Sequence, residues 1–154
     1  MNIFLLSPNI RESCQELAEL DPIRARKQLV ECCQLLATVD HIKKGSTDML
    51  RADGTPYKMA HPHHPITKHM CVSYANISLC VGVSYCLSNI YPTHACAYSF
   101  NKWMYSHYDE VITGTHCVVR KDHDTLYVNS LTEYSELMRP YVMAKIANNK
   151  VKVK

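Results

Sequence analysis

The segment DPIRARKQLVECCQLLATVDH, residues 21–41, constrains the fold of this chain more than any other stretch. Asp21 is a preferred N-cap residue, and Pro22 fits the first position of a helix. Apolar side chains then recur at the 3.6-residue spacing of one helix face. They are Leu29, Cys32, Cys33, Leu36 and Val39. Because such a face must be buried against other elements, the sequence predicts a core assembled around this helix.

Most of the remaining chain also predicts helices. Periodic or apolar stretches indicate helices over residues 11–20, 68–89, 95–112 and 132–149. Residues 2–6 predict an extended segment or short strand, and the polar residues 43–56 predict an exposed connection.

A different pattern follows near the C-terminus. Residues 115–130 alternate on both sides of a polar tetrapeptide, which predicts a β-hairpin. We therefore expect a mainly α, compact single domain over residues 1–150. It has a short N-terminal extended segment, a small C-terminal β-hairpin and a basic tail at 151–154.

Composition limits the class of protein. The chain has 154 residues and a net charge of +3, which excludes a strongly acidic DNA mimic and is compatible with a polyanionic partner. Its eight cysteines include no C-x-x-C pair and lie mostly in apolar runs, which favours core thiols in a reducing compartment. No stretch has the pattern of a signal peptide or the length of a membrane span. We expect a cytoplasmic protein that does not bind membranes.

A polar stripe follows the first long helix. Arg24, Lys27, Glu31 and Gln34 are spaced so that they share one narrow arc, with Thr38 alongside. One interpretation is an ordinary solvated face, with an i,i+4 ion pair between Lys27 and Glu31. The other is a cleft in which a carboxylate moves protons while the flanking cations bind phosphate. The spacing alone does not choose between them.

The segment HPHHPITKH, residues 61–69, concentrates four histidines and two prolines. His61, His63 and His64 could ligate a divalent metal such as Mg²⁺, Mn²⁺ or Zn²⁺, although no second ligand cluster stands at a recognised spacing. We prefer a proline-stiffened loop that presents His61 and His64 to a sugar-phosphate or to Glu31. In a third interpretation one histidine caps a helix, or it lies in the core with its ring nitrogens hydrogen-bonded.

Three blocks in order, MNIFLLSPN, RARKQLVECCQLLATV and YKMAHPHHP followed by SYAN, resemble a group of small phage proteins. That group is distantly similar to the phage pyrimidine-dimer DNA glycosylases of the endonuclease V type, which have abasic-site lyase activity. The resemblance covers roughly residues 1–80. The matching positions are Lys27, Glu31, Gln34, Leu35, Leu36, Thr38, Tyr57, Lys58, His61, His64, Pro65, Ser73 and Asn76.

The resemblance implies a metal-free mechanism. In that family the N-terminal α-amine attacks C1′ of the damaged or abasic deoxyribose, and the resulting imine leads to β-elimination of the 3′ phosphate. The catalytic glutamate of the family corresponds to Glu31, and nearby arginines hold phosphates. Two positions depart from the family: Arg24 replaces a histidine, and Asn2 replaces a small threonine. The nucleophile is then the Met1 amine, with Met1 retained, or Lys27 with a lowered pKa, or the lyase step is absent.

A second cationic and aromatic stretch, SFNKWMYSHY at residues 99–108, could stack on an unpaired base or wedge into a duplex, although such aromatics also fit a core. The residues expected to contact DNA are Arg26, Lys58, Lys68, Lys102 and Trp103.

Three functions stay open at this point. The leading expectation is an enzyme without a cofactor that nicks double-stranded DNA at abasic or damaged nucleotides, with possible DNA glycosylase activity and coupling to a host DNA glycosylase that supplies the substrate. The second is a metal-dependent hydrolytic nuclease with His61, His63 and His64 as ligands. The third is a non-enzymatic phage protein that binds a host factor.

Overall fold

The computed structural model describes residues 3–70, 74–113 and 131–152. These residues form helices and their connections, with one isolated β-bridge between Leu50 and Pro56. The helices are α1 (Ile10–Leu20), α2 (Pro22–Lys44), α3 (Pro65–Met70), α4 (Tyr74–Ile90), α5 (Ala95–Thr113) and α6 (Leu131–Lys152). The prediction of a mainly α fold is confirmed. The expected hairpin at 115–130 lies outside the described residues and stays a prediction.

The observed helices differ from the predicted ones in two places. The stretch 68–89 contains most of α4 and the end of α3, and residues 71–73 between them are not described. At the C-terminus α6 continues to Lys152 and so includes two residues of the expected tail. A polar end can continue a helix in this way because lysine has a high helix propensity.

Helix α2 begins and ends as its sequence predicts. Asp21 Oδ1 accepts a hydrogen bond from the backbone N–H of Arg24 at 3.0 Å, and Pro22 occupies the first turn. At the other end Gly45 has a φ of +79° and donates its N–H to the carbonyl of His41 at 2.8 Å. A left-handed residue at this place favours glycine, which has no Cβ to clash.

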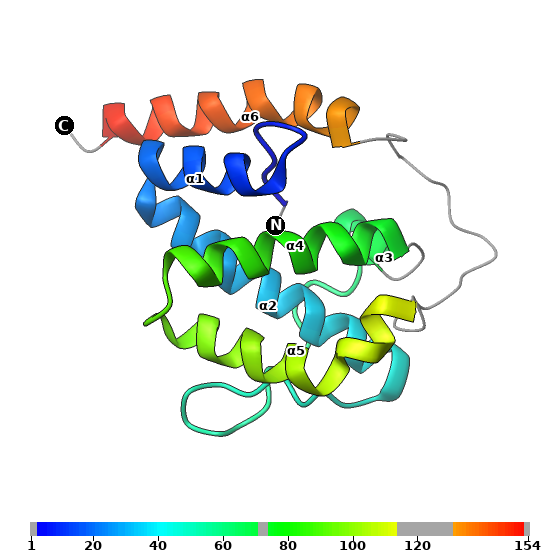
Figure 1. Ribbon diagram of the computed structural model, residues 1–154. Helices are drawn as coiled ribbons and strands as arrows, with labels where there is room; N and C mark the ends of the chain where they lie inside the picture. The colour runs from blue at the N-terminus through cyan, green and yellow to red at the C-terminus, as the bar shows by residue number, and fades with distance from the viewer. Residues whose placement is uncertain (1–2, 71–73, 114–130, 153–154) are drawn as a thin grey trace.

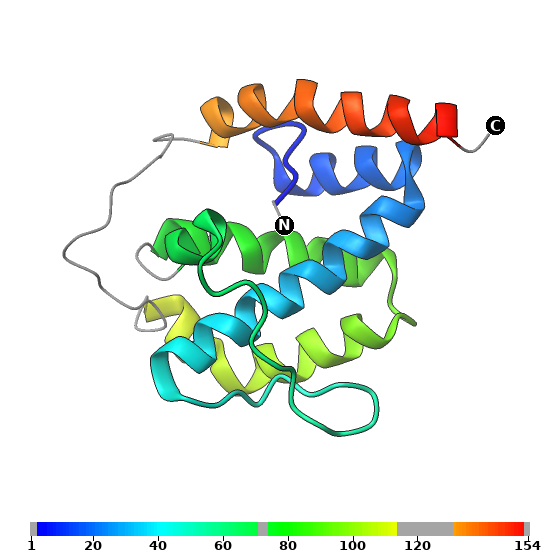
Figure 2. The same cartoon turned by 180° about the vertical axis from the view of Figure 1, so that it is seen from behind.

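The core surrounds α2, which contacts α1, α3, α4 and α5. From the end of α1, helix α2 crosses one side of α4 and α5, behind them in Figure 1 and in front of them in Figure 2. All five side chains of its predicted apolar face are fully buried, which confirms that prediction. The buried arc is wider than the sequence pattern, since Leu35, Ala37, Thr38 and Asp40 are also fully buried. A helix enclosed on several sides must bury some polar groups too, and these need hydrogen-bond partners.

The N-terminal segment 3–6 is buried between α6 and the central helices (Figure 1). Tyr134 on α6 donates its hydroxyl proton to the carbonyl of Ile3, and Arg139 Nη1 donates to the carbonyl of Leu6 at 3.2 Å. Arg139 also forms a bidentate ion pair with Glu16 on α1, with N–O distances of 2.7 and 2.9 Å. Helix α6 thus fixes both the N-terminal segment and α1.

Candidate functional site

The polar stripe of α2 forms one edge of the candidate site. Lys27 is exposed, whereas Arg24, Glu31 and Gln34 are half-buried and Thr38 is buried. A half-buried carboxylate beside an exposed lysine is accessible to a substrate and partly shielded from water. The stripe is therefore not a fully solvated face along its whole length.

The histidine-rich segment approaches α2 through Thr38. Thr38 Oγ1 accepts the backbone N–H of Ala60 at 2.9 Å and lies 3.1 Å from the carbonyl oxygen of Ala60. One turn nearer the end of α2, His41 Nε2 lies 2.8 Å from the carbonyl oxygen of Tyr57. The segment from Tyr57 to Ala60 therefore runs antiparallel to α2. Figure 2 shows the chain passing in front of α2 before it enters α3.

The individual histidines have different environments. His61 is exposed and has a φ of +49°, a conformation that non-glycine residues adopt rarely and that is found disproportionately at functional sites. His63 is exposed as well. His64 Nδ1 accepts the backbone N–H of Ile66 at 3.1 Å and so caps α3. Burial lowers the pKa of His64, and the neighbouring His61 contributes to the shift.

The N-terminal segment reaches α2 next to Glu31. The backbone N–H of Phe4 donates to Gln28 Oε1 at 2.8 Å in a buried hydrogen bond. Gln28 and Glu31 are i,i+3 neighbours, so the side chain that fixes Phe4 lies on the same side of α2 as the predicted catalytic carboxylate. Met1 and Asn2 lie outside the described residues.

Some predicted site residues are not joined by direct contacts. Arg24 Nε lies 3.4 Å from Asp21 Oδ2, within its own helix turn. Within the described part of the chain no hydrogen bond or ion pair links Glu31 to Arg24, His61 or His64. The structure brings together the N-terminal segment, the α2 stripe and the histidine segment as elements. A direct meeting of their side chains stays a prediction.

The residues predicted to contact DNA fall into two groups. Lys58, Lys68 and Lys102 are exposed, and the guanidinium of Arg26 stacks 5.5 Å from the centre of the Tyr91 ring. Trp103 is only 1% exposed. Its indole N–H donates to Asp40 Oδ2 at 2.8 Å. The interpretation of Trp103 as a stacking platform is therefore wrong; its bulk fills the core, as large aromatics usually do.

A cluster that the sequence analysis missed lies beside Trp103. Asp40, Asp48 and His107 offer ligand atoms within 4.8 Å of one another. They come from α2, the connection after it and α5, so sequence spacing gives no hint of the cluster. The one local signal is an acidic residue, Asp40, directly after Val39 of the core face.

The predicted metal ligands His61, His63 and His64 do not form such a group. Among the residues with described side chains, the cluster at Asp40 is the one set of three whose ligand atoms converge. His64 also uses Nδ1 as a helix cap. Proline restriction and helix capping thus account for the compact spacing of these histidines better than metal coordination does.

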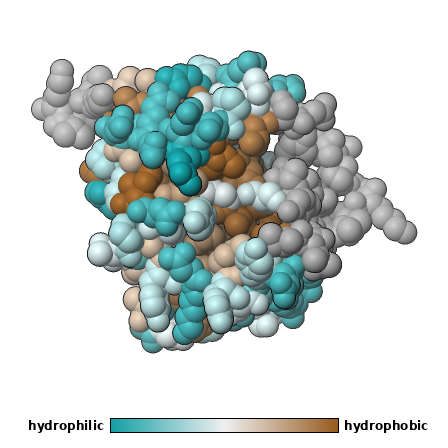
Figure 3. Space-filling model, viewed as in Figure 1, coloured by the Kyte–Doolittle hydropathy of each residue, from teal (hydrophilic) through white to brown (hydrophobic). Residues whose placement is uncertain are grey.

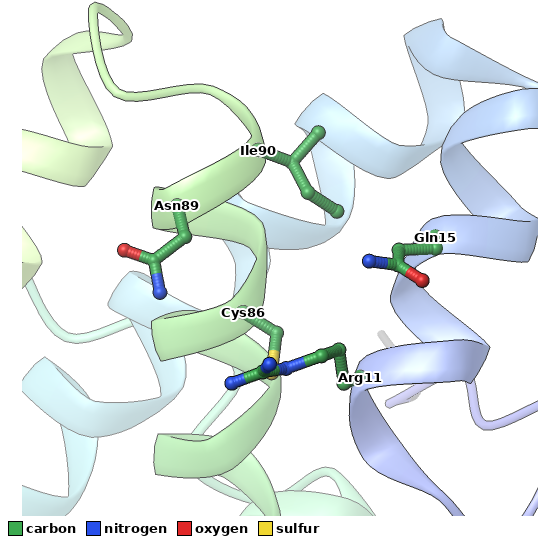
Figure 4. Close-up of a pocket in the computed structure, with 5 residues that line it drawn as sticks. All are labelled: Arg11, Gln15, Cys86, Asn89 and Ile90. Atoms are coloured by element: carbon green, nitrogen blue, oxygen red, sulfur yellow. The ribbon is translucent and has the colours of Figure 1, made fainter.

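A pocket of about 280 Å³ lies between α1 and α4, away from the predicted site residues. Its lining includes Arg11, Gln15, Cys86, Asn89 and Ile90 (Figure 4). Apolar surface is visible in a band between these two helices (Figure 3). Cys86 is half-buried, and the other five described cysteines are buried and free, which confirms their interpretation as core thiols.

None of the described helices is long and apolar enough to cross a membrane. Comparisons with protein-family models, curated proteins and solved structures found no match for this chain.

Proposed function

We propose that this protein nicks double-stranded DNA at abasic or damaged nucleotides through an imine formed by its N-terminal amine. One observation carries the proposal: the buried hydrogen bond from Phe4 to Gln28, 2.8 Å long, fixes the N-terminal segment one helix turn from Glu31. Met1 is three residues before Phe4, and a chain of that length spans at most about 10 Å. In this proposal the α-amine acts within that reach of Phe4, close enough to approach Gln28 and Glu31.

The reaction requires few groups. An α-amine is less basic than a lysine side chain, so a larger fraction of it is the unprotonated nucleophile at neutral pH; it adds to the C1′ aldehyde of the ring-opened deoxyribose. Loss of water gives an iminium ion. A base removes a C2′ proton, the electron pair forms a C2′–C3′ double bond, and the 3′ phosphate leaves. Water then hydrolyses the imine and releases the protein.

Glu31 has the position and the chemistry for the proton transfers. Its carboxylate is half-buried, so it is reachable by a sugar while its charge is less screened than in bulk water. A negative charge beside the iminium ion stabilises that cation. We assign Glu31 the role of base and electrostatic stabiliser, and we assign His61, on its strained backbone, a role in orienting the sugar-phosphate.

DNA is held in this proposal by cations near the site. Lys27 lies on the α2 stripe, Lys58 precedes the histidine segment, and Lys68 lies on α3. All three are exposed and free to contact phosphates along one strand. Arg24 forms an ion pair with Asp21, so it would have to exchange partners to bind phosphate.

A nicking assay tests the proposal directly. Duplex oligonucleotides with one abasic site, one uracil or no lesion are incubated with the protein in EDTA, with and without borohydride. We expect nicking at the abasic site, a 3′ unsaturated aldehyde as product, and a protein–DNA adduct trapped by borohydride at Met1. Glu31→Gln should trap or nick at least tenfold more slowly, whereas Glu19→Gln, at an exposed position of α1, controls for the same change of charge.

Two results would favour the other functions. Nicking that needs Mg²⁺ or Mn²⁺ and never yields an adduct would indicate a hydrolytic nuclease. Absence of nicking would indicate a protein that binds a host factor, if a folded Glu31→Gln variant also has the same effect in the host cell as the wild type. An adduct at Lys27 instead of Met1 would support the lyase reaction and identify Lys27 as its nucleophile.

A further inference from the structure

The side chains of Asp40, Asp48 and His107 converge on one point, where the connection after α2 meets α5. His107 Nε2 lies 2.6 Å from Asp48 Oδ1, and all three ligand atoms lie within 4.8 Å of one another. Two atoms bound to one ion at about 2.1 Å each are at most about 4.2 Å apart. Small rotations of the side chains therefore suffice to place all three around a single ion.

Groups behind these ligands hold them in orientation. Asp40 is fully buried, and its Oδ2 accepts hydrogen bonds from Trp103 Nε1 and from the hydroxyl of Thr47, both at 2.8 Å. The Trp103 ring lies against His107, with 4.8 Å between the ring centres. Outer contacts of this kind fix the rotamers of metal-binding residues.

His107 has the second partner that metal-bound histidines commonly have. Its Nδ1 lies 3.3 Å from Glu110 Oε2, which directs the other ring nitrogen, Nε2, toward Asp40 and Asp48. A carboxylate behind the imidazole raises the basicity of the ligand nitrogen. Glu110 itself has Lys44 at 3.9 Å, so its charge is partly balanced from outside the cluster. Asp40 and Asp48 supply the two negative charges that a divalent cation matches.

We infer that Asp40, Asp48 and His107 bind a first-row divalent metal ion, Zn²⁺ or Mn²⁺. Imidazole suits Zn²⁺ and carboxylates suit Mn²⁺, whereas Mg²⁺ is bound mainly through oxygen ligands and keeps several waters. Asp48 has a 56% exposed side chain, so the ion can enter from solvent and keep water in its remaining positions. The ion replaces the proton shared between His107 and Asp48, and it ties the connection after α2 to α5.

The inference is independent of the nicking activity, because the cluster includes no residue of the proposed lyase site. Its test is the thermal stability of the metal-free full chain with added Zn²⁺, Mn²⁺ or Mg²⁺. We expect a rise in Tm of about 5 to 10 °C at a hundredfold excess of Zn²⁺ or Mn²⁺ over its Kd. Calorimetry in two buffers should show one ion bound and protons released.

Two variants locate the site. Asp48→Asn keeps an oxygen that accepts from His107 but removes an anionic ligand, and we expect it to lose most of the Tm rise. His63→Gln, in the histidine-rich segment, should keep the full rise. Loss of the rise in His63→Gln, an unchanged rise in Asp48→Asn, an equal rise with Mg²⁺, or no rise with Zn²⁺ and Mn²⁺ would each overturn the inference.

Discussion

Replacing Gln28 by methionine should release the N-terminal segment from α2. Gln28 is 1% exposed, and its Oε1 accepts the backbone N–H of Phe4 at 2.8 Å. Methionine has nearly the same length and a similar helix propensity, so it fills the same space without opening a cavity. Its thioether is only a weak acceptor. The substitution therefore removes the buried hydrogen bond with Phe4, together with the weaker one that Gln28 Nε2 donates to Cys32 Sγ at 3.6 Å.

The magnitude follows from the donor that is left behind. A buried backbone N–H without a good acceptor costs about 1–3 kcal/mol, and we expect the free energy of unfolding to fall by that amount. Gln34→Met is the matched control, because it is the same change on the same helix. The side chain of Gln34 is half-buried and forms no hydrogen bond within the described residues, so this variant should change stability by less than about 0.5 kcal/mol.

Urea unfolding, followed by the fluorescence of the single tryptophan Trp103, measures both variants. If the loss is local, the equilibrium constant for detachment of segment 3–6 rises about 5- to 150-fold, and borohydride trapping on abasic DNA should fall with the fraction of molecules in which the segment stays attached. A Gln28→Met variant with the stability of Gln34→Met would refute the assignment of this hydrogen bond. Lower stability with unchanged trapping would mean that this hydrogen bond stabilises the fold but does not position the proposed nucleophile.

Three further predictions concern other contacts. His64→Asn should keep the cap of α3, worth about 1 kcal/mol, at all pH values. In the wild type the lowered pKa of His64 means that the folded state prefers the neutral ring. This stabilisation is present above the ordinary histidine pKa of about 6.5 and is lost as the pH falls below it, so the two proteins should differ most in urea unfolding at pH 5. Glu16→Gln should lower stability by less than about 1 kcal/mol at pH 7, because its ion pair with Arg139 is partly exposed. The contact with Arg139 lowers the pKa of Glu16, so the wild type should lose this contribution in acid unfolding and the variant should not. Trp103→Phe should cost about 2–4 kcal/mol by circular dichroism, because it removes packing volume and a hydrogen bond to the buried Asp40 carboxylate.

Local signals in the sequence were sufficient for most of the helical fold. The Asp21-Pro22 start and the apolar period of α2 are properties of adjacent residues, and the structure confirms both. The pattern could not show that α2 is enclosed on several sides, because that depends on α1, α3, α4 and α5. The apolar run 68–89 concealed the separate helix α3, whose start at Pro65 depends on the cap from His64.

For the candidate site, too, only local features could be predicted from the sequence. The spacing on α2 predicts that Lys27 and Glu31 share one face, because the period of a helix fixes where residues three or four apart lie. Trp103 was misassigned because exposure is set by tertiary packing, and an aromatic residue next to lysine has the same local sequence in a core or on a surface. The cluster of Asp40, Asp48 and His107 could not be found from spacing, because its members are brought together only by packing of α5 against α2.

An amine nucleophile at a chain end requires that the end be held rigidly, because a fraying terminus would lose the advantage of position. Here the segment is fixed from two sides. Gln28 on α2 holds Phe4, and Tyr134 and Arg139 on α6 hold Ile3 and Leu6. The sequence resemblance covers roughly residues 1–80 and so does not include α6. If the proposed chemistry is right, the C-terminal helix is part of the apparatus that positions the nucleophile, although it contributes no catalytic group. Variation in α6 should then alter the rate of imine formation more than it alters the binding of DNA.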